Sequence, residues 1–169
     1  MTRLFVVCDF TDSNVMLDLY VEFEKVLATL EKHQINYALC GGLAVTFLTQ
    51  PRFTEDIDIL VPPNDCERCK AVLLPLGFKF FSTPMRFDND LVEVHKLTKI
   101  DASVNDYIFL DVISAISPVA QEILSKRIRL VWQDKQVWVV TREGLIKLKE
   151  NSKRLKDQLD IEALKSGTP

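Results

Sequence analysis

Three aspartates in two hydrophobic segments are the residues of this chain best suited to chemistry. Asp56 and Asp58 stand two residues apart in DIDILV, residues 56–61, and Asp111 interrupts the apolar run DYIFLDVIS, residues 106–114. In a strand, residues i and i+2 face the same side, so Asp56 and Asp58 offer neighbouring oxygen donors. A third acid from an adjacent strand would complete a site for a hard divalent cation such as Mg²⁺.

Each acid also has an ordinary structural explanation. An Asp-x-Asp pair is common at a solvated strand end, and Asp111 could cap a turn or pair with an arginine. An ionised group within an apolar strand is costly unless it is paired or bound to a metal. The segment IFLDVI offers Asp111 no cation of its own. Taken together, the three aspartates favour a cation site.

A pair of glycines precedes these acids. Gly41 and Gly42 follow the apolar segment INYALC and open LAVTFLTQ, a short predicted helix that Pro51 ends. Backbone N–H groups at a helix start carry partial positive charge, and glycine lets a phosphate approach them closely. Two glycines could equally mark a tight strand-to-helix turn. Their place just before the acids favours a phosphate-binding turn beside a metal.

The remaining patterns predict the elements that must position these residues. Apolar residues at helical spacing predict a first amphipathic helix within 11–34, with Thr11, Asp12 and Ser13 available as caps. Strands are predicted at 35–40, 56–61, 78–81, 92–97 and 106–114, and helices at 43–50, 64–74, 116–126 and 141–164. Residues 128–140 predict a hairpin that turns near Gln133 to Gln136, in which Trp132 and Trp138 are packing residues.

Composition limits the function classes. The 169 residues suit one domain, 1–169, with a core at about 14–140 and a helical segment at about 141–166. A net charge of −3 argues against a general nucleic-acid coat protein. The sequence contains no segment of bilayer length and no secretory leader, so we expect a cytoplasmic protein without a membrane partner. A lone Cys66-x-x-Cys69 is weak evidence for zinc or redox chemistry, and reduced thiols are the simpler interpretation.

The ordered motifs resemble those of the DNA polymerase beta-like nucleotidyltransferase superfamily. The segment CGGLAVTFLTQPRFTEDIDILV has the double glycine, short helix and Asp-x-Asp strand, and the later aspartate follows in its own apolar strand. Arg52 and Thr54 ahead of the acids resemble the branch of abortive-infection (AbiEii-type) toxin nucleotidyltransferases and uncharacterised bacterial relatives. The tail LIKLKENSKRLKDQLDIEAL is similar to that branch's closing helices, through Lys149, Arg154, Lys156, Asp157 and Asp160.

This resemblance implies an α/β (α+β) nucleotidyltransferase fold, with a mixed central sheet flanked by helices and C-terminal helices closing on the active-site cleft. It implies that Asp56 and Asp58 hold two Mg²⁺ ions and that Asp111 binds the one near the acceptor and serves as general base. It implies that Gly41, Gly42, Arg52, Thr54 and Lys149 contact the nucleoside triphosphate. An ion pair of Arg52 with Glu55 or Asp58 is an equal alternative. Many superfamily members have serine at the position of Gly42. Glycine at this position lacks the hydroxyl contact to the nucleotide phosphates.

The expected reaction moves a nucleoside monophosphate from an Mg-NTP such as ATP to an acceptor hydroxyl and releases pyrophosphate. The acceptor could be tRNA or a protein, and the chain could be the toxin of a toxin-antitoxin pair with an antitoxin partner. Two alternatives remain open. One is a non-catalytic nucleotide-binding regulatory module, and the other is a small-molecule (antibiotic) adenylyltransferase.

Overall fold

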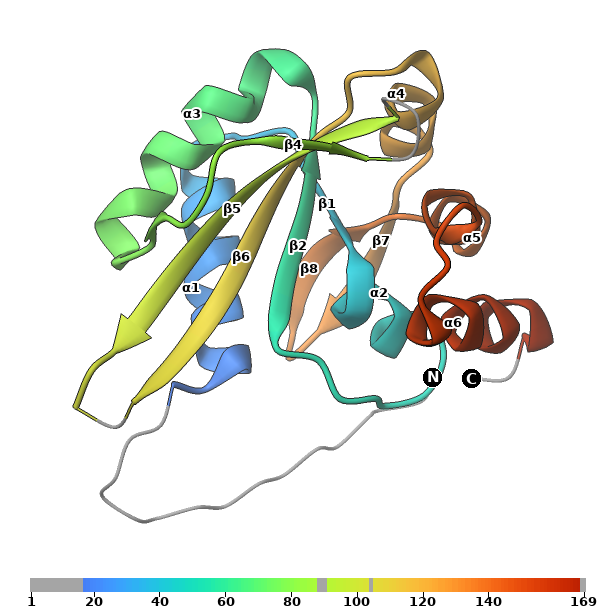
Figure 1. Cartoon of the computed structure of the whole chain (residues 1–169), viewed down its shortest axis with the longest axis horizontal. Coiled ribbons are helices and arrows are strands. Elements are labelled where there is room, and N and C mark those ends of the chain that lie inside the picture. The colour runs from blue at the N-terminus through green and yellow to red at the C-terminus, as the bar shows by residue number, and fades with distance from the viewer. Residues whose placement is uncertain (1–16, 88–90, 104, 168–169) are drawn as a thin grey trace.

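A mixed β-sheet organises the computed structural model of this chain, which describes residues 17–87, 91–103 and 105–167. In the described residues eight strands follow the order β3-β5-β6-β2-β1-β8-β7, with β4 paired to the outer side of β5 (Figure 1). The strands are β1 (Ala38–Cys40), β2 (Asp56–Val61), β3 (Lys79–Phe80), β4 (Met85–Phe87), β5 (Val92–Asp101), β6 (Asp106–Ser114), β7 (Ile128–Trp132) and β8 (Lys135–Val139). β2 is parallel to β6 and β1 to β8, while the other neighbours are antiparallel. The predicted mixed sheet is confirmed.

Helices cover the two faces of this sheet unequally. They are α1 (Leu19–Lys32), α2 (Gly41–Leu48), α3 (Pro63–Leu73), a 3-10 turn η1 (Leu74–Leu76), α4 (Pro118–Ser125), α5 (Arg142–Lys149) and α6 (Leu155–Ser166). In Figure 1, α1 and α3 lie on one side of the sheet. On the other side α2 packs on β1 and β2, and α5 and α6 pack on α2. In the part of the chain that the structure describes, no helix covers the face of β5 and β6 on this second side.

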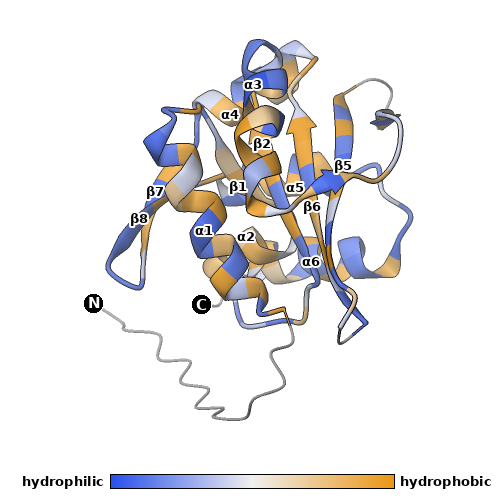
Figure 2. Cartoon of the chain, turned by 90° about the vertical axis from the view of Figure 1, so that its left-hand side faces the viewer, coloured by the Kyte–Doolittle hydropathy of each residue, from blue (hydrophilic) through white to orange (hydrophobic). Residues whose placement is uncertain are grey.

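The core explains why these segments fold as they do. β2 and β6 alternate partly exposed and buried positions along much of their length, and Ile57, Ile59, Leu110 and Val112 are fully buried. Figure 2 shows hydrophobic residues concentrated along these central strands. Burying such side chains is the main favourable term in folding. The alternation leaves the polar positions of both strands on the opposite face, where the three acids stand.

Several sequence predictions need correction in their bounds. The first helix begins at Leu19, where the Asp18 carboxylate accepts hydrogen bonds from the backbone N–H groups of Tyr20 and Val21. The predicted caps Thr11, Asp12 and Ser13 lie outside the described residues. β4 was not predicted. The helical pattern over 141–164 forms two helices, α5 and α6, because residues 150–154 are not helical. The predicted single domain over 1–169 stays a prediction.

The predicted hairpin is confirmed and turns at Gln133 and Asp134, both with positive φ, of 45° and 62°. Trp132 packs on Phe23 and Phe47, as expected of a packing residue. The guanidinium groups of Arg127 and Arg129 lie 4.5 and 4.4 Å from the Trp138 ring. No helix among the described residues is long and apolar enough to cross a bilayer.

Candidate active site

The register of β2 and β6 brings the predicted acids together. Asp58 is the direct neighbour of Asp111 across this parallel pair, and Asp56 is the neighbour of Phe109. Side chains at paired positions point to the same face, so the three carboxylates share one side of the sheet. Acids from two distant segments therefore lie side by side, and their roles stay predictions.

The electrostatics of this place favour a bound cation. Burial and, to a smaller extent, the charges of Asp111 and Asp56 together raise the pKa of Asp58 to about 6. Burial also raises the pKa of Asp111, although Lys96 acts in the opposite direction. The Lys96 ammonium donates to both oxygens of Asp111 at 2.7 and 2.8 Å. The site thus carries excess negative charge, which one ammonium group partly neutralises.

Lys96 is a site residue that sequence reasoning missed. The segment around Asp111 holds no cation, but β5 and β6 form a hairpin in which Asp101 pairs with Asp106. Counting five residues back from Asp101 and five forward from Asp106 pairs Lys96 with Asp111. The pairing of Lys96 with Asp111 could have been predicted once the position of the hairpin turn was known. The periodicity of either strand alone does not give this pairing.

The glycine pair packs directly on the acids and on the loop before them. Gly41 is the first residue of α2 and has a φ of +61°. A Cβ placed on it would lie 1.8 Å from Asp58 Oδ2, and one on Gly42 would lie 2.5 Å from Thr54 Oγ1. At Gly41 only glycine allows both the contact with Asp58 and the positive φ. The start of α2 is therefore in contact with Asp58 and with the Thr54 side chain.

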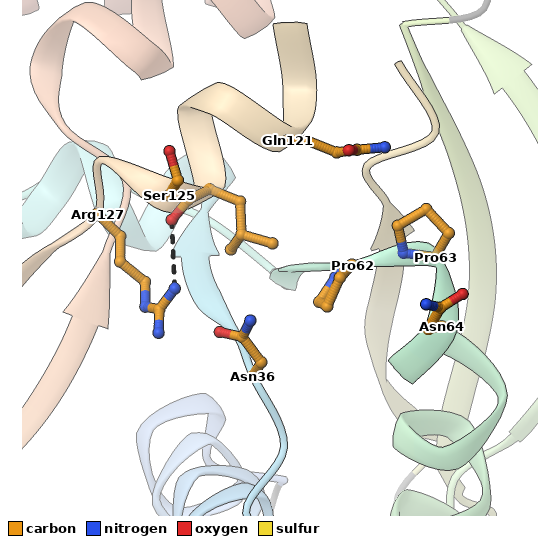
Figure 3. Close-up of a pocket in the computed structure, with 8 residues that line it drawn as sticks. Asn36, Pro62, Pro63, Asn64, Gln121, Ser125 and Arg127 are labelled. Carbon is orange, nitrogen blue, oxygen red and sulfur yellow. Dashed lines mark hydrogen bonds between the residues drawn. The ribbon is translucent and has the colours of Figure 1, made fainter. Parts of the chain in front are cut away.

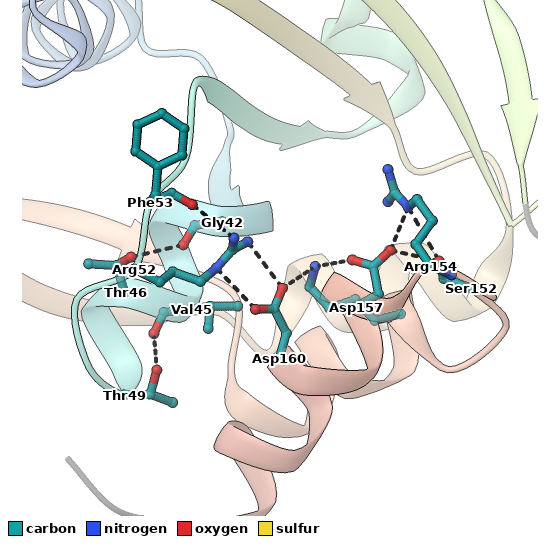
Figure 4. Close-up of polar contacts among 11 residues, drawn as sticks. Gly42, Val45, Thr46, Thr49, Arg52, Phe53, Ser152, Arg154, Asp157 and Asp160 are labelled. Atoms are coloured by element: carbon teal, nitrogen blue, oxygen red, sulfur yellow. Dashed lines mark hydrogen bonds and ion pairs between the residues drawn. The ribbon is translucent and has the colours of Figure 1, made fainter.

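Arg52 does not pair with Glu55 or Asp58, the partners considered from the sequence. Its guanidinium group instead reaches α6, where Nε lies 3.0 Å from Asp160 Oδ1 and Nη2 donates to Oδ2 at 3.1 Å. A Cβ on Gly42 would lie 2.8 Å from the same guanidinium group. Arg52 therefore stands between the glycine turn and the C-terminal helices (Figure 4).

Lys149 continues this network within the C-terminal helices. Its ammonium lies 2.7 Å from Asp157 Oδ1 and 2.9 Å from Asp160 Oδ2, and Lys149 is only 9% exposed. Asp157 also accepts hydrogen bonds from Ser152 and Arg154, both at 2.6 Å. Burial opposes ionisation of Asp157, but these donors outweigh it and lower its pKa to about 2. The acids of the tail therefore hold its cations in place.

A different cluster is tighter than the aspartates. Among the described residues, Cys66, Glu67 and His95 are the one set of three whose donor atoms all lie within 4.8 Å of one another. The Lys70 ammonium occupies this place, 2.6 Å from Glu67 Oε1 and 3.1 Å from His95 Nδ1. Burial raises the pKa of the Cys66 thiol to about 11, so no thiolate is available at neutral pH. The simpler interpretation of a reduced thiol fits this environment.

Burial likewise raises the pKa of Cys69, to about 12. A surface hollow of about 520 Å³ is also separate from the acids (Figure 3). Pro62, Asn64, Gln121 and Arg127 are among the residues that line it. The hollow contains no carboxylate and none of the predicted site residues. The predicted site residues therefore lie away from this hollow, at the sheet face of Asp58 and Asp111.

Comparison with protein-family models and with curated protein sequences gives no match. Solved structures do match. The lincosamide antibiotic adenylyltransferase LnuA, crystallised with lincomycin, superposes with a TM-score of 0.57 at 20% identity over 92% of this chain and 100% of its own. The chain has the nucleotidyltransferase fold.

Two further structures support this assignment of the fold. ANT(2")-Ia in complex with adenylyl-2"-tobramycin gives a TM-score of 0.61 at 14% identity, over 86% of this chain and 87% of its own. An antigenic nucleotidyltransferase-like protein from Paracoccidioides brasiliensis gives 0.53 at 18% identity, over 87% and 74%. The predicted fold class is confirmed, and the AbiEii-type branch stays a prediction.

Proposed function

We propose that this protein transfers a nucleoside monophosphate from a magnesium-bound nucleoside triphosphate to an acceptor hydroxyl. The observation that carries this proposal is the pairing of Asp58 with Asp111 across two parallel strands, beside a helix that begins with Gly41. Three acids on one face and a glycine turn against one of them are the parts that phosphoryl-type transfer requires. The nucleotidyltransferase fold of the chain is consistent with that chemistry.

The acids suit Mg²⁺ by the chemistry of their donors. All three offer hard carboxylate oxygens, and the raised pKa of Asp58 is what a nearby cation would reverse. The metal would be held by Asp56, Asp58 and Asp111. The Asp111 carboxylate would then bind the metal in place of the Lys96 ammonium. Bound there, Mg²⁺ would neutralise charge on the attacking and leaving oxygens.

The chain's own residues would bind the nucleotide and move the proton. The backbone N–H groups of Gly41 and Gly42 would bind the triphosphate, with Arg52 and Lys149 as the nearest cations. Asp111 would accept the proton of the acceptor hydroxyl as that oxygen bonds to the α-phosphorus and the bond to pyrophosphate breaks.

The direct test is incubation with each α-labelled NTP and Mg²⁺, with tRNA or a protein extract as acceptor. Labelled product and released pyrophosphate are expected for the natural sequence and not for Asp58→Asn. Asp134→Asn, in the exposed hairpin turn, is a matched control that should keep full activity. Equal labelling by Asp58→Asn would refute the proposal, and tight Mg-NTP binding without transfer to any acceptor would favour the regulatory module instead.

A small-molecule acceptor is the second candidate, because LnuA and ANT(2")-Ia superpose over 92% and 86% of this chain. Lincomycin and tobramycin are then the acceptors to try first. ATP-dependent adenylylation of either, detected as a mass increase, would support this candidate. The toxin role and the antitoxin partner implied by the family resemblance remain predictions.

A further inference from the structure

Three aromatic side chains lie beside the acids on the uncovered face of the sheet. Phe109 stands two residues before Asp111 on β6 and is the cross-strand neighbour of Asp56. Tyr107 stands two residues further back, and Phe81 follows β3. The ring centroid of Phe109 lies 5.2 Å from that of Phe81 and 5.1 Å from that of Tyr107. We call Phe81, Tyr107 and Phe109 the aromatic ledge.

The ledge is open to solvent although it is made of large rings. Phe81 is 57% exposed and Tyr107 is 50% exposed. Among the described residues, no helix covers this part of the sheet, because α2 packs on β1 and β2 and the helices α5 and α6 pack on α2 (Figure 1). Contiguous exposed apolar side chains with polar groups at their rim are typical of interaction and ligand-binding surfaces. The ledge begins about 7 Å from Asp111, at roughly 3.3 Å per strand residue.

Cations accompany the rings. The Lys96 ammonium that holds Asp111 also lies 4.8 Å from the centre of the Phe109 ring. Lys79 is exposed and pairs with Thr98, which is itself the neighbour of Phe109, so Lys79 stands on the same face. Aromatic rings interleaved with cations suit stacked bases and their phosphates.

The position of the ledge indicates which reactant it would hold. The glycine turn, Arg52 and Lys149 lie on the β1 and α2 side of Asp58. The ledge lies on the other side, beyond Asp111, because the strand order is β5-β6-β2-β1. A triphosphate bound at the glycines would therefore leave the ledge to the second reactant. The acceptor hydroxyl would approach Asp111 from that side.

We propose that Phe81, Tyr107 and Phe109 form the acceptor subsite and that they stack a nucleobase adjacent to the acceptor hydroxyl. The acceptor is then a nucleoside-bearing molecule, such as the end of a single strand. This inference rests on the proposed function, since it takes Asp111 as the residue nearest the acceptor.

Binding of a fluorescein-labelled single-stranded RNA octamer with a free 3′ hydroxyl, measured by anisotropy in the absence of NTP, tests the subsite. Phe81→Ala and Phe109→Leu should each weaken binding roughly tenfold, as expected for the loss of one base–aromatic stack. Phe80→Ala is the matched control, because Phe80 is 58% exposed but contacts Lys70 on the opposite face. The control should bind as the natural sequence does.

Photocrosslinking with 4-thiouridine at the 3′ end of the same RNA gives a second readout that does not depend on affinity. The crosslinks should map to Phe81 or to the segment from Tyr107 to Phe109. Equal weakening by Phe80→Ala, crosslinks elsewhere, or absence of RNA binding would overturn the subsite. So would an equal loss of Mg-NTP affinity in Phe81→Ala, since the ledge would then hold the donor base.

Failure of the subsite can be distinguished from failure of the proposed function. If Mg-NTP turnover depends on Asp58 but the aromatic substitutions leave RNA binding unchanged, only the subsite is wrong. If Mg-NTP neither binds nor reacts, the proposed function is wrong, whatever the RNA does. Transfer to lincomycin or tobramycin that is insensitive to Phe109→Leu would also reject a nucleoside-bearing acceptor.

Discussion

Replacing Asp58 with asparagine should stabilise the folded protein at neutral pH while removing its proposed activity. Burial and the neighbouring acids raise the pKa of Asp58 from its usual 3.8 to about 6. The folded protein therefore holds the Asp58 proton more tightly than the unfolded chain does. Ionised Asp58 opposes folding, and this penalty grows as pH rises from about 4 to about 6.

The size of the effect follows from the same two values. Each pKa unit corresponds to about 1.4 kcal/mol, so the penalty approaches roughly 3 kcal/mol above pH 6 and falls below about 1 kcal/mol at pH 4. Asparagine has nearly the same shape and no charge. Asp58→Asn should thus raise the free energy of unfolding at pH 7.5 by up to about 3 kcal/mol and change it little at pH 4.

Urea unfolding followed by the fluorescence of Trp132 and Trp138 measures this difference at both pH values. Asp157→Asn is a control of opposite sign, because the donors around Asp157 lower its pKa to about 2. Ionised Asp157 supports folding above about pH 4, and this support is lost as pH falls through 2, so its asparagine variant should be less stable at pH 7.5. The reasoning would be refuted if Asp58→Asn had no higher free energy of unfolding than the natural sequence at pH 7.5, or if the increase were equal at both pH values.

Three other outcomes are expected. Mg²⁺ should raise the melting temperature of the natural sequence and not that of Asp58→Asn, because a cation relieves the penalty only where the charge exists; an equal shift in both would count against a metal at Asp58. Gly41→Ala should unfold at lower temperature and lose Mg-NTP binding in calorimetry, because its Cβ would lie 1.8 Å from Asp58 Oδ2. Gly77→Ala, also at positive φ but with no atom nearer than 3.4 Å, should lose stability only. Lys149→Met should lower the free energy of unfolding by roughly 3 kcal/mol, because it leaves two buried acids without their shared cation. Lys126→Met, in an exposed pair, should cost less than about 1 kcal/mol, and similar losses in both variants would contradict this view of the Lys149 network.

Local patterns in the sequence determined the chemical groups and the elements that carry them. The alternation in DIDILV predicted β2 over its full length and put Asp56 and Asp58 on one face, because side chains alternate along any strand. The segment DYIFLDVIS likewise coincides with β6 and carries Asp111. The glycine pair predicted a turn between a strand and a helix, and Gly41 has a positive φ at this turn. These features depend on residues only a few positions apart.

The tertiary structure decided which groups meet. The parallel register of β2 and β6 puts Asp58 beside Asp111, and no periodicity within either strand encodes that pairing. Arg52 pairs with Asp160, 108 residues away, because α6 packs near α2. The local sequence had suggested Glu55 or Asp58 as its partner. The aromatic ledge also exists only because Phe81 is brought beside β6. Contacts over such distances follow from how whole elements pack, which the order of residues along one segment does not reveal.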